Sequence, residues 1–196
     1  MSEFFEFIWE TAKVVFISLL IILPVRYFLI QPFFVKGSSM VPNFQDKQYI
    51  LVDKWTYRLG SPERGDVVIF RYPGDPSEYF IKRIIGLPGE TVLAGNDNTV
   101  TIFNSRYPDG FVLNEKGYLP ASNPTYCGAN TTYCGVKVTL KDNEYFMMGD
   151  NREHSSDSRF FGPVNISYFA GMAWLRLWPL DQINLIPRTQ YPPVVE

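Results

Sequence analysis

The first 35 residues are rich in apolar side chains, and this stretch limits what the chain can fold into more than any other. Residues 14–25 form an uncharged, almost wholly apolar run, which is shorter than the roughly 20 residues a membrane-spanning helix needs. The apolar character continues on both sides of the run, through Trp9 and through Tyr27 to Ile30. We therefore predict one transmembrane helix over about residues 8–30, within an N-terminal membrane anchor at residues 1–35.

A cleaved signal peptide is the alternative interpretation of this stretch, with Lys13 as its charged region and residues 14–25 as its apolar core. No pair of small residues suited to cleavage follows, since residues 26–34 read RYFLIQPFF and are bulky. Trp9 and Tyr27 suit the two membrane–water interfaces. These features favour a retained, single-pass anchor.

After Pro42 the pattern changes to short runs rich in Val, Ile, Tyr and Phe, separated by turn signals such as SPERGD and YPGDPSE. None of the runs is long enough to indicate a helix. We predict a mostly β domain of antiparallel sheets over residues 36–196, with an irregular insertion at about residues 104–134. The predicted strands are Gln48–Asp53, Asp66–Tyr72, Tyr79–Ile85, Thr99–Phe103, Gly135–Leu140 and Glu144–Met148.

The apolar stretch Tyr168–Leu180, which contains Trp174 and Trp178, has two interpretations. It is either a buried core strand or an exposed apolar rim that rests on a bilayer, where tryptophan is favoured. The sequence does not decide between them.

Composition excludes several function classes. A formal net charge of −2 gives no basic surface for phosphates, so we expect no nucleic-acid partner. Cys127 and Cys134 flank the segment GANTTY, which has no histidine or carboxylate to complete a metal site. We expect neither a metal nor a cofactor. The two cysteines are either inert thiols or a local disulfide, and the predicted exported domain favours the disulfide.

The candidates for catalysis reduce to a serine and a lysine. The single histidine, His154, lies in a serine-rich loop away from any GxSxG motif, and we expect it to be solvated. Lysine activates a serine only when it is neutral, so burial must lower its pKa towards 7–8. Lys82 has the apolar neighbours Phe80, Ile81 and Ile84. Strand alternation also allows Lys82 to face water, so its spacing alone leaves both orientations open.

Four stretches occur in the order found in bacterial type I signal peptidases (leader peptidases), and the chain resembles that family over nearly its whole length. They are SMVP after the anchor, RGDVVIF at residues 64–70, KRIIGLPG, and GDNREHSSDSR at residues 149–159. The resemblance implies that Ser39, not Ser38, is the nucleophile and that Lys82 is the general base. It also implies a signal-peptidase-like β fold.

The resemblance assigns supporting roles to five further residues. Ser155 is expected to hydrogen-bond and orient the lysine. Two carboxylates are expected to pair with arginines and hold the site; these residues are Asp150, Asp157, Arg83 and Arg159.

The resemblance is incomplete next to the nucleophile. Gly37 stands where some members have a serine or threonine that donates to the oxyanion, and Lys36 stands where relatives often have proline. We therefore expect the oxyanion hole to rest on the Ser39 backbone N–H, together with Ser38 as a second donor.

The predicted function is a membrane-anchored serine endopeptidase that removes signal peptides from exported preproteins, with small residues preferred at −1 and −3. Shallow apolar pockets are expected to select those residues, and their predicted lining is Met40, Phe80, Ile81 and Val35. The expected location is the bacterial cytoplasmic (inner) membrane, single-pass, with the catalytic domain on the outer or periplasmic face. The expected partners are signal peptides and the lipid bilayer, and the secretion translocon stays open as a further partner.

Two rival functions remain at this stage. One is a maturation peptidase of the same clan that processes a single pilin-like substrate. The other is a non-catalytic receptor for signal sequences. Such a receptor would be indicated by loss of the serine or the lysine, but both residues are present.

Overall fold

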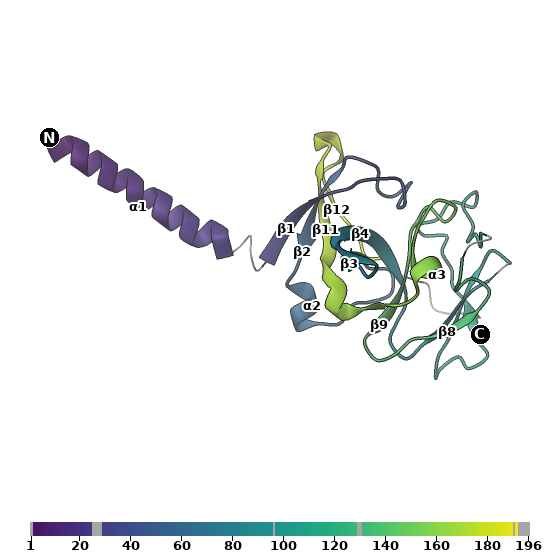
Figure 1. Ribbon diagram of the computed structural model, residues 1–196. Helices are drawn as coiled ribbons and strands as arrows, with labels where there is room; N and C mark the ends of the chain where they lie inside the picture. Colours follow the sequence, from purple (N-terminus) through teal and green to yellow (C-terminus); the bar gives the residue numbers. More distant parts are fainter. Residues whose placement is uncertain (1, 25–28, 96, 129–130, 190, 192–196) are drawn as a thin grey trace.

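The computed structural model of the chain describes residues 2–24, 29–95, 97–128, 131–189 and 191 (Figure 1). An N-terminal helix is followed by two antiparallel β-sheets with two short helices, so the predicted class, mostly β with one N-terminal apolar helix, is confirmed. 

Helix α1 (Ser2–Pro24) is, among the described residues, the one helix long and apolar enough to cross a membrane. Its 23 residues rise about 34 Å at about 1.5 Å per residue, enough for a hydrocarbon core of about 30 Å. Its apolar window is not buried against any described residue, and α1 extends away from the sheets (Figure 1). The helix begins and ends earlier than predicted. Its last residue is Pro24, which has no backbone N–H to donate to a helical hydrogen bond. Residues 25–28 lie outside the described residues.

The residues after the anchor form a strand rather than the end of the predicted helix. β1 (Ile30–Phe34) pairs antiparallel with β2 (Tyr49–Asp53), with Phe34 opposite Tyr49. Bulky and aromatic residues suit a pleated surface, and Pro32 is tolerated because β1 is an edge strand. The predicted domain boundary at residue 35 is therefore corrected: the β domain includes β1.

The larger sheet holds the strands that build the site. Its order is β1-β2-β11-β3-β4-β9-β10, and β12 pairs with β11 outside this path. All pairings are antiparallel. The remaining bounds are β3 (Val67–Tyr72), β4 (Asp75–Gly86), β9 (Glu144–Met148), β10 (Val164–Asn165), β11 (Phe169–Trp178) and β12 (Asn184–Leu185).

The smaller sheet has the order β7-β6-β5-β8 and is also antiparallel. Short helices connect strands elsewhere in the chain. These elements are β5 (Thr91–Ala94), β6 (Val100–Phe103), β7 (Phe111–Val112), β8 (Lys137–Thr139), α2 (Thr56–Leu59), α3 (Ser158–Phe161), and the 3-10 turns η2 (Ile166–Tyr168) and η3 (Leu180–Gln182).

Three clusters of buried apolar side chains form the core. One lies between the smaller sheet and the β4–β9 pair and includes Ile85, Val92 and Phe146. A second packs β1, β2, β3 and β11 together with the loop after β1, through Val35, Met40 and Ile50 among others. The third gathers aromatic rings around Phe70.

The stretch Tyr168–Leu180 combines both alternatives left open by the sequence. Most of it is β11, a central strand that pairs with β2 and β3. Ala173 is buried, yet Trp174 and Trp178 on the same strand are 41% and 49% exposed. The strand therefore contributes to the core while presenting two tryptophans to the surface.

The irregular insertion is packed rather than loose. Leu113, Tyr118 and Leu119 belong to the core cluster beneath the smaller sheet. A disulfide joins Cys127 and Cys134, with their Cα atoms 5.7 Å apart. The insertion thus follows the smaller sheet closely and approaches the site described below.

Candidate active site

The loop between β1 and β2 carries Ser39 and is fixed at its ends by backbone hydrogen bonds. Val35 N–H donates to the Gln48 carbonyl oxygen (2.8 Å), and Lys47 N–H donates to the Val35 carbonyl oxygen (2.9 Å). The Ser39 carbonyl oxygen accepts from Asn151 N–H (3.0 Å). These bonds join the SMVP stretch to the GDNR stretch, so two segments distant in sequence hold Ser39 in place.

Lys82 lies where β4 gains a second strand neighbour. Before this point β4 pairs with β3, and from Arg83 onward it also pairs with β9. Lys82 is 3% exposed, which decides between the two orientations left open by the sequence. Its Nζ donates to Ser39 Oγ at 2.8 Å and to the Ile81 carbonyl oxygen at 2.9 Å.

Burial changes the acid–base behaviour of this lysine. Loss of hydration lowers the pKa of the Lys82 amine from 10.5 to about 8, with Arg159 adding to the effect, while Asp157 and Asp150 oppose it. At pH 7 a pKa of about 8 leaves roughly one amine in ten neutral. A neutral Lys82 is therefore accessible at physiological pH, and it lies within hydrogen-bond distance of the serine hydroxyl.

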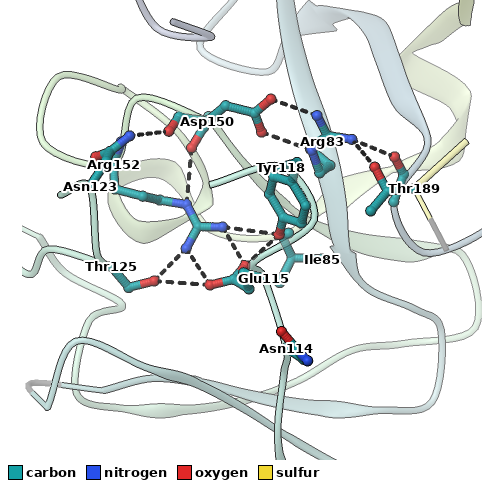
Figure 2. A network of polar contacts seen from close by, with 12 residues as sticks. Arg83, Ile85, Asn114, Glu115, Tyr118, Asn123, Thr125, Asp150, Arg152 and Thr189 are labelled. Atoms are coloured by element: carbon teal, nitrogen blue, oxygen red, sulfur yellow. Dashed lines mark hydrogen bonds and ion pairs between the residues drawn. The ribbon is translucent and has the colours of Figure 1, made fainter. Parts of the chain in front are cut away.

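The two buried carboxylates near Lys82 are each held by an arginine rather than by the lysine. Asp150 accepts from Arg83 Nε (2.8 Å) and from a terminal Arg83 nitrogen (2.6 Å), as Figure 2 shows. Asp157 accepts from Arg159 Nε (2.8 Å) and from a terminal nitrogen (2.7 Å). Because each carboxylate is neutralised by its own guanidinium, neither forms an ion pair with Lys82, and the low pKa of the amine persists.

The Asp157 carboxylate stays ionised despite its complete burial. Desolvation alone would raise the pKa of Asp157, but the hydrogen bonds and charge of Arg159 and the N–H of Gly149 (3.0 Å) lower it overall. Asp157 also caps α3 by accepting from Arg159 N–H (3.2 Å). The pair therefore fixes both the GDNR loop and the short helix after it.

A third ion pair, between Arg152 and Glu115, connects the insertion to the GDNR loop (Figure 2). Arg152 is buried and donates to both carboxylate oxygens of Glu115, one of them at 2.8 Å. Its Nε donates to the Gly149 carbonyl oxygen (3.1 Å), and Asn123 Nδ2 donates to the Asp150 carbonyl oxygen (2.6 Å). The insertion thus supports the backbone of residues 149–152 directly.

Gly149 is in close contact with both the Ser39 backbone and the Ser155 side chain. A Cβ at position 149 would overlap the Ser155 hydroxyl oxygen and the Ser39 carbonyl oxygen. Only glycine leaves room for this approach. 

The expected contact between Ser155 and the lysine is not formed in the structure, and this expectation is corrected. The Ser155 hydroxyl is buried and has no hydrogen-bond partner among the described residues. Lys82 Nζ instead donates to Ser39 Oγ and to the carbonyl oxygen of Ile81, the residue before it in β4.

Two backbone N–H groups beside the nucleophile are free to donate. Among the described residues, neither Ser38 N–H nor Ser39 N–H makes a hydrogen bond. Ser38 is exposed, and its carbonyl oxygen accepts from Val41 N–H (3.1 Å) and from Asn151 Nδ2 (3.1 Å). Gly37 N–H is occupied by Asp46 Oδ1 (2.8 Å). Both N–H groups are therefore available to an acceptor next to Ser39.

A groove of about 640 Å³ leads away from Ser39 and Lys82 between the end of β1 and the middle of β4. Three of the four predicted pocket residues line it, namely Val35, Phe80 and Ile81. Met40 does not line it; this residue is 1% exposed and packs in the core beneath the loop. The prediction for Met40 is corrected, because its thioether points inward and accepts from Asp150 N–H (3.4 Å).

The solitary histidine takes no part in these contacts. The His154 side chain is 69% exposed, and its nearest charged neighbour is Glu153, at 4.0 Å. Within the described part of the chain, no group of three or more His, Cys, Asp or Glu residues is placed to hold a metal ion.

The stretches that build this site match a known family. A family model described as signal peptidase, peptidase S26, matches residues 8–178. The chain belongs to this signal peptidase family. It is therefore a serine peptidase, and the recognition made from the four sequence stretches is confirmed.

Several curated signal peptidases align with most of the chain. A probable signal peptidase I-2 of Synechocystis is 34% identical over 90% of this chain and 76% of its own length. The signal peptidase I of Bacillus amyloliquefaciens is 38% identical over 77% of this chain and 75% of its own. A crystal structure of a signal peptidase I from Enterococcus faecalis is 30% identical and covers 58% of this chain and 97% of that chain, with a TM-score of 0.44.

Some residues of this signal peptidase site were not found from the sequence. Phe33 and Tyr79 line the groove from opposite strands, with ring centroids 5.1 Å apart. Glu115 supports the site from the insertion, 37 residues before its partner Arg152. No sequence pattern near Glu115 or Arg152 indicated that they pair, because the pair forms only when the insertion packs against residues 149–152. Phe33 was hidden because its strand was assigned to the anchor.

Proposed function

We propose that this signal peptidase is a membrane-anchored serine endopeptidase that cleaves N-terminal signal peptides from exported preproteins by a Ser39–Lys82 dyad. The observation that carries the proposal is the 2.8 Å contact between Lys82 Nζ and Ser39 Oγ, made by an amine whose pKa falls to about 8 on burial. A serine needs a base within this distance, and a buried lysine is suited to be that base.

The reaction follows from these two groups. Neutral Lys82 accepts the Ser39 hydroxyl proton while Oγ attacks the carbonyl carbon of the scissile bond. The backbone N–H groups of Ser39 and Ser38 stabilise the resulting oxyanion. When the intermediate collapses, the C–N bond breaks and protonated Lys82 gives its proton to the leaving amine, which is the new N-terminus of the mature protein. Lys82 then deprotonates a water molecule that attacks the acyl ester. The acyl C–O bond to Ser39 breaks, Oγ takes the proton back from Lys82, and the signal peptide leaves as a carboxylate.

The groove is suited to an extended peptide. Among the described strands, β1 pairs only with β2, and β4 before Arg83 pairs only with β3. Both strands therefore present an unpaired edge, and the Phe33–Tyr79 contact brings these edges together at the groove. A substrate added as a β-strand between them would gain backbone hydrogen bonds.

The groove walls support a preference for small residues at −1 and −3. Phe80, Ile81 and Val35 line the groove, and alternate side chains of an extended substrate would point at this wall. A bulky side chain would have to displace these packed residues, which costs roughly 1–3 kcal/mol.

The proposed topology is a single pass through the cytoplasmic membrane by α1, with the β domain on the outer face. The length of α1 and its lack of burial support this placement. The exposed Trp174 and Trp178 are compatible with contact between the domain and the bilayer surface. The secretion translocon is proposed as a partner only because its substrates emerge on that face.

Cleavage of a preprotein by the full chain in a neutral detergent tests the proposal. Mass spectrometry of the products should find one cut after a small residue at the end of the signal peptide. The Ser39→Ala variant serves as the matched inactive control. Cleavage of several unrelated preproteins would exclude a peptidase dedicated to one substrate, and failure to cleave any would contradict the proposed function.

A further inference from the structure

Asn43 directly follows the SMVP stretch, four residues after Ser39, and is half-buried. Its side-chain nitrogen donates to Asp150 Oδ2 (2.8 Å) and to the Tyr118 carbonyl oxygen (2.8 Å). A carboxylate and a carbonyl oxygen only accept, so the amide nitrogen of Asn43, not its amide oxygen, faces both partners. Asn43 therefore joins the loop of Ser39 to the GDNR loop and to the insertion.

Residues 38–44 form a compact turn, which we call the nucleophile turn. Val41 N–H donates to the Ser38 carbonyl oxygen (3.1 Å), and Phe44 N–H donates to the Met40 carbonyl oxygen (2.9 Å). The two hydrogen-bonded segments are consecutive and overlap, as in tight turns of three and four residues. A displacement at one end of the nucleophile turn is therefore transmitted to its other end.

Two consecutive residues of the GDNR loop hold the nucleophile turn. Near its start, Asn151 N–H donates to the Ser39 carbonyl oxygen (3.0 Å). Near its end, the Asn43 amide donates to the Asp150 carboxylate. Between these contacts Asp150 N–H donates to the Met40 thioether (3.4 Å), and sulfur is a weak acceptor. Without its amide, residue 43 would leave the later half of the turn held to this loop only by that weak bond.

The Asp150 carboxylate also binds the strand that carries the base. Arg83 follows Lys82 in β4 and donates to both carboxylate oxygens, from Nε (2.8 Å) and from a terminal nitrogen (2.6 Å), as Figure 2 shows. Asp150 Oδ2 thus accepts from Arg83 and from Asn43 at once. A bidentate guanidinium–carboxylate pair has a fixed geometry, so Asp150 relates the position of the nucleophile turn to that of β4.

We propose that Asn43 is a positioning residue, whose amide holds the nucleophile turn against the Asp150–Arg83 pair and so keeps Ser39 Oγ within reach of Lys82 Nζ. The inference rests on the proposed Ser39–Lys82 dyad. Asn43 itself contacts neither member of the dyad and acts through Asp150 and the turn. Its effect on the rate can be large, because misplacing reacting groups by about 1 Å costs roughly a hundredfold.

Steady-state kinetics of preprotein cleavage by the full chain in detergent test the proposal. Asn43→Ala should lower kcat by at least about tenfold and leave KM unchanged, because residue 43 does not line the substrate groove. The fold should persist, since Arg176 donates to the Asn43 carbonyl oxygen (2.7 Å) and holds the backbone in either variant. Asn43→Asp keeps the size of the side chain but replaces the donor with an acceptor, so it should lower kcat at least as much.

Asn104→Ala is the matched control, because it removes the same kind of contact elsewhere. Asn104 Nδ2 donates to Glu90 Oε1 (3.1 Å), and Glu90 is paired with Arg64. This variant should leave kcat unchanged, and thermal unfolding of each variant measures any loss of stability. Equal losses of kcat in Asn43→Ala and Asn104→Ala would overturn the inference. Activity retained by Asn43→Asp but lost in Asn43→Ala would show that the side chain only fills space, which would overturn it too.

A titration of Lys82 that needs no substrate separates this inference from the proposed function. The ε-carbon of Lys82 is followed by ¹³C NMR of the full chain labelled at lysine, and its signal is identified by its absence in Lys82→Met. The charged groups that act on this amine are Asp157, Asp150 and Arg159. Displacement of the nucleophile turn would admit water to the buried amine and so raise the pKa of Lys82 above its value of about 8.

The pKa of Lys82 should therefore rise in Asn43→Ala and stay unchanged in Asn104→Ala. This rise in a protein that cleaves no preprotein would support the inference and contradict the proposed function. Cleavage with a normal kcat and an unshifted Lys82 pKa in Asn43→Ala would overturn the inference and leave the peptidase intact.

Discussion

Replacing Lys82 with methionine should make the protein more stable at neutral pH, although it removes the proposed base. A pKa that falls from 10.5 to about 8 means that protonated Lys82 destabilises the folded state by about 3 kcal/mol, at about 1.4 kcal/mol per pKa unit. Methionine has a similar length and carries no charge. It leaves the Ser39 hydroxyl and the Ile81 carbonyl oxygen without their shared partner, which costs about 1 kcal/mol. We expect a net gain of about 2 kcal/mol at pH 7.

The pH dependence of this gain has a definite sign. The folded-state pKa of Lys82 is lowered, so between about pH 8 and pH 10.5 the unfolded chain binds more protons than the folded protein. The stability of the wild type therefore rises through this window relative to the variant. The advantage of Lys82→Met should shrink by about 2 to 3 kcal/mol between pH 7 and pH 10. The constant cost of the lost hydrogen bonds does not affect this change.

The measurement is urea unfolding of the full chain in detergent at several pH values, followed by tryptophan fluorescence. Lys141→Met is the matched control, because the Lys141 side chain is 84% exposed and its removal should give no pH-dependent gain. A difference between Lys82→Met and wild type that stays constant within about 0.5 kcal/mol from pH 7 to pH 10 would refute the argument that burial lowers the pKa of this lysine.

Three further substitutions test other parts of the site. Ser39→Ala should abolish cleavage, whereas Ser38→Ala should leave measurable activity, because only Ser39 contacts the base; product mass spectrometry checks both. Gly149→Ala should lower kcat by at least about a hundredfold, since a Cβ there displaces the nucleophile loop. Glu115→Ala should lower the free energy of unfolding by about 3–5 kcal/mol, because it leaves the buried Arg152 charge without its carboxylate.

Each of these predictions has a control or an outcome that contradicts it. Equal loss of activity in the two serine variants would contradict the assignment of the nucleophile. Gly117→Ala places a Cβ in open space and should leave kcat unchanged; similar losses for Gly117→Ala and Gly149→Ala would refute the steric argument. Glu63 pairs with Arg188 at the surface, so Glu63→Ala should cost at most about 1 kcal/mol. A comparable cost for Glu115→Ala would show that its ion pair contributes little.

The sequence predicted the parts of the fold that depend on local pattern. Short runs rich in Val, Ile, Tyr and Phe located β2, β3, β6, β8 and β9, and the turn signals between them were informative. β4 begins at Asp75, earlier than the predicted Tyr79, because the polar residues Asp75–Glu78 form an exposed part of the strand. β5, β7, β10 and β12 were not predicted, since strands of two to four residues are held by their neighbours rather than by their own composition.

The candidate site shows the same limit. Motif order identified Ser39 and Lys82, but the orientation of Lys82 depends on β9 joining β4 at Arg83, a long-range pairing. The arginine partners of Asp150 and Asp157 were predicted from the motifs, and the structure brings both pairs together. Met40 was misplaced because an apolar residue next to a nucleophile suits a pocket and a core equally well.

The pH dependence of kcat/KM for preprotein cleavage tests the central claim, that neutral Lys82 is the base, most directly. Only the neutral amine accepts the Ser39 proton, so activity should rise about tenfold from pH 7 to pH 9, with its midpoint near the Lys82 pKa of about 8. The profile should be unchanged in His154→Ala, whose side chain is exposed. A midpoint near 6.5, the ordinary pKa of an imidazole, that disappears in His154→Ala would contradict the lysine mechanism.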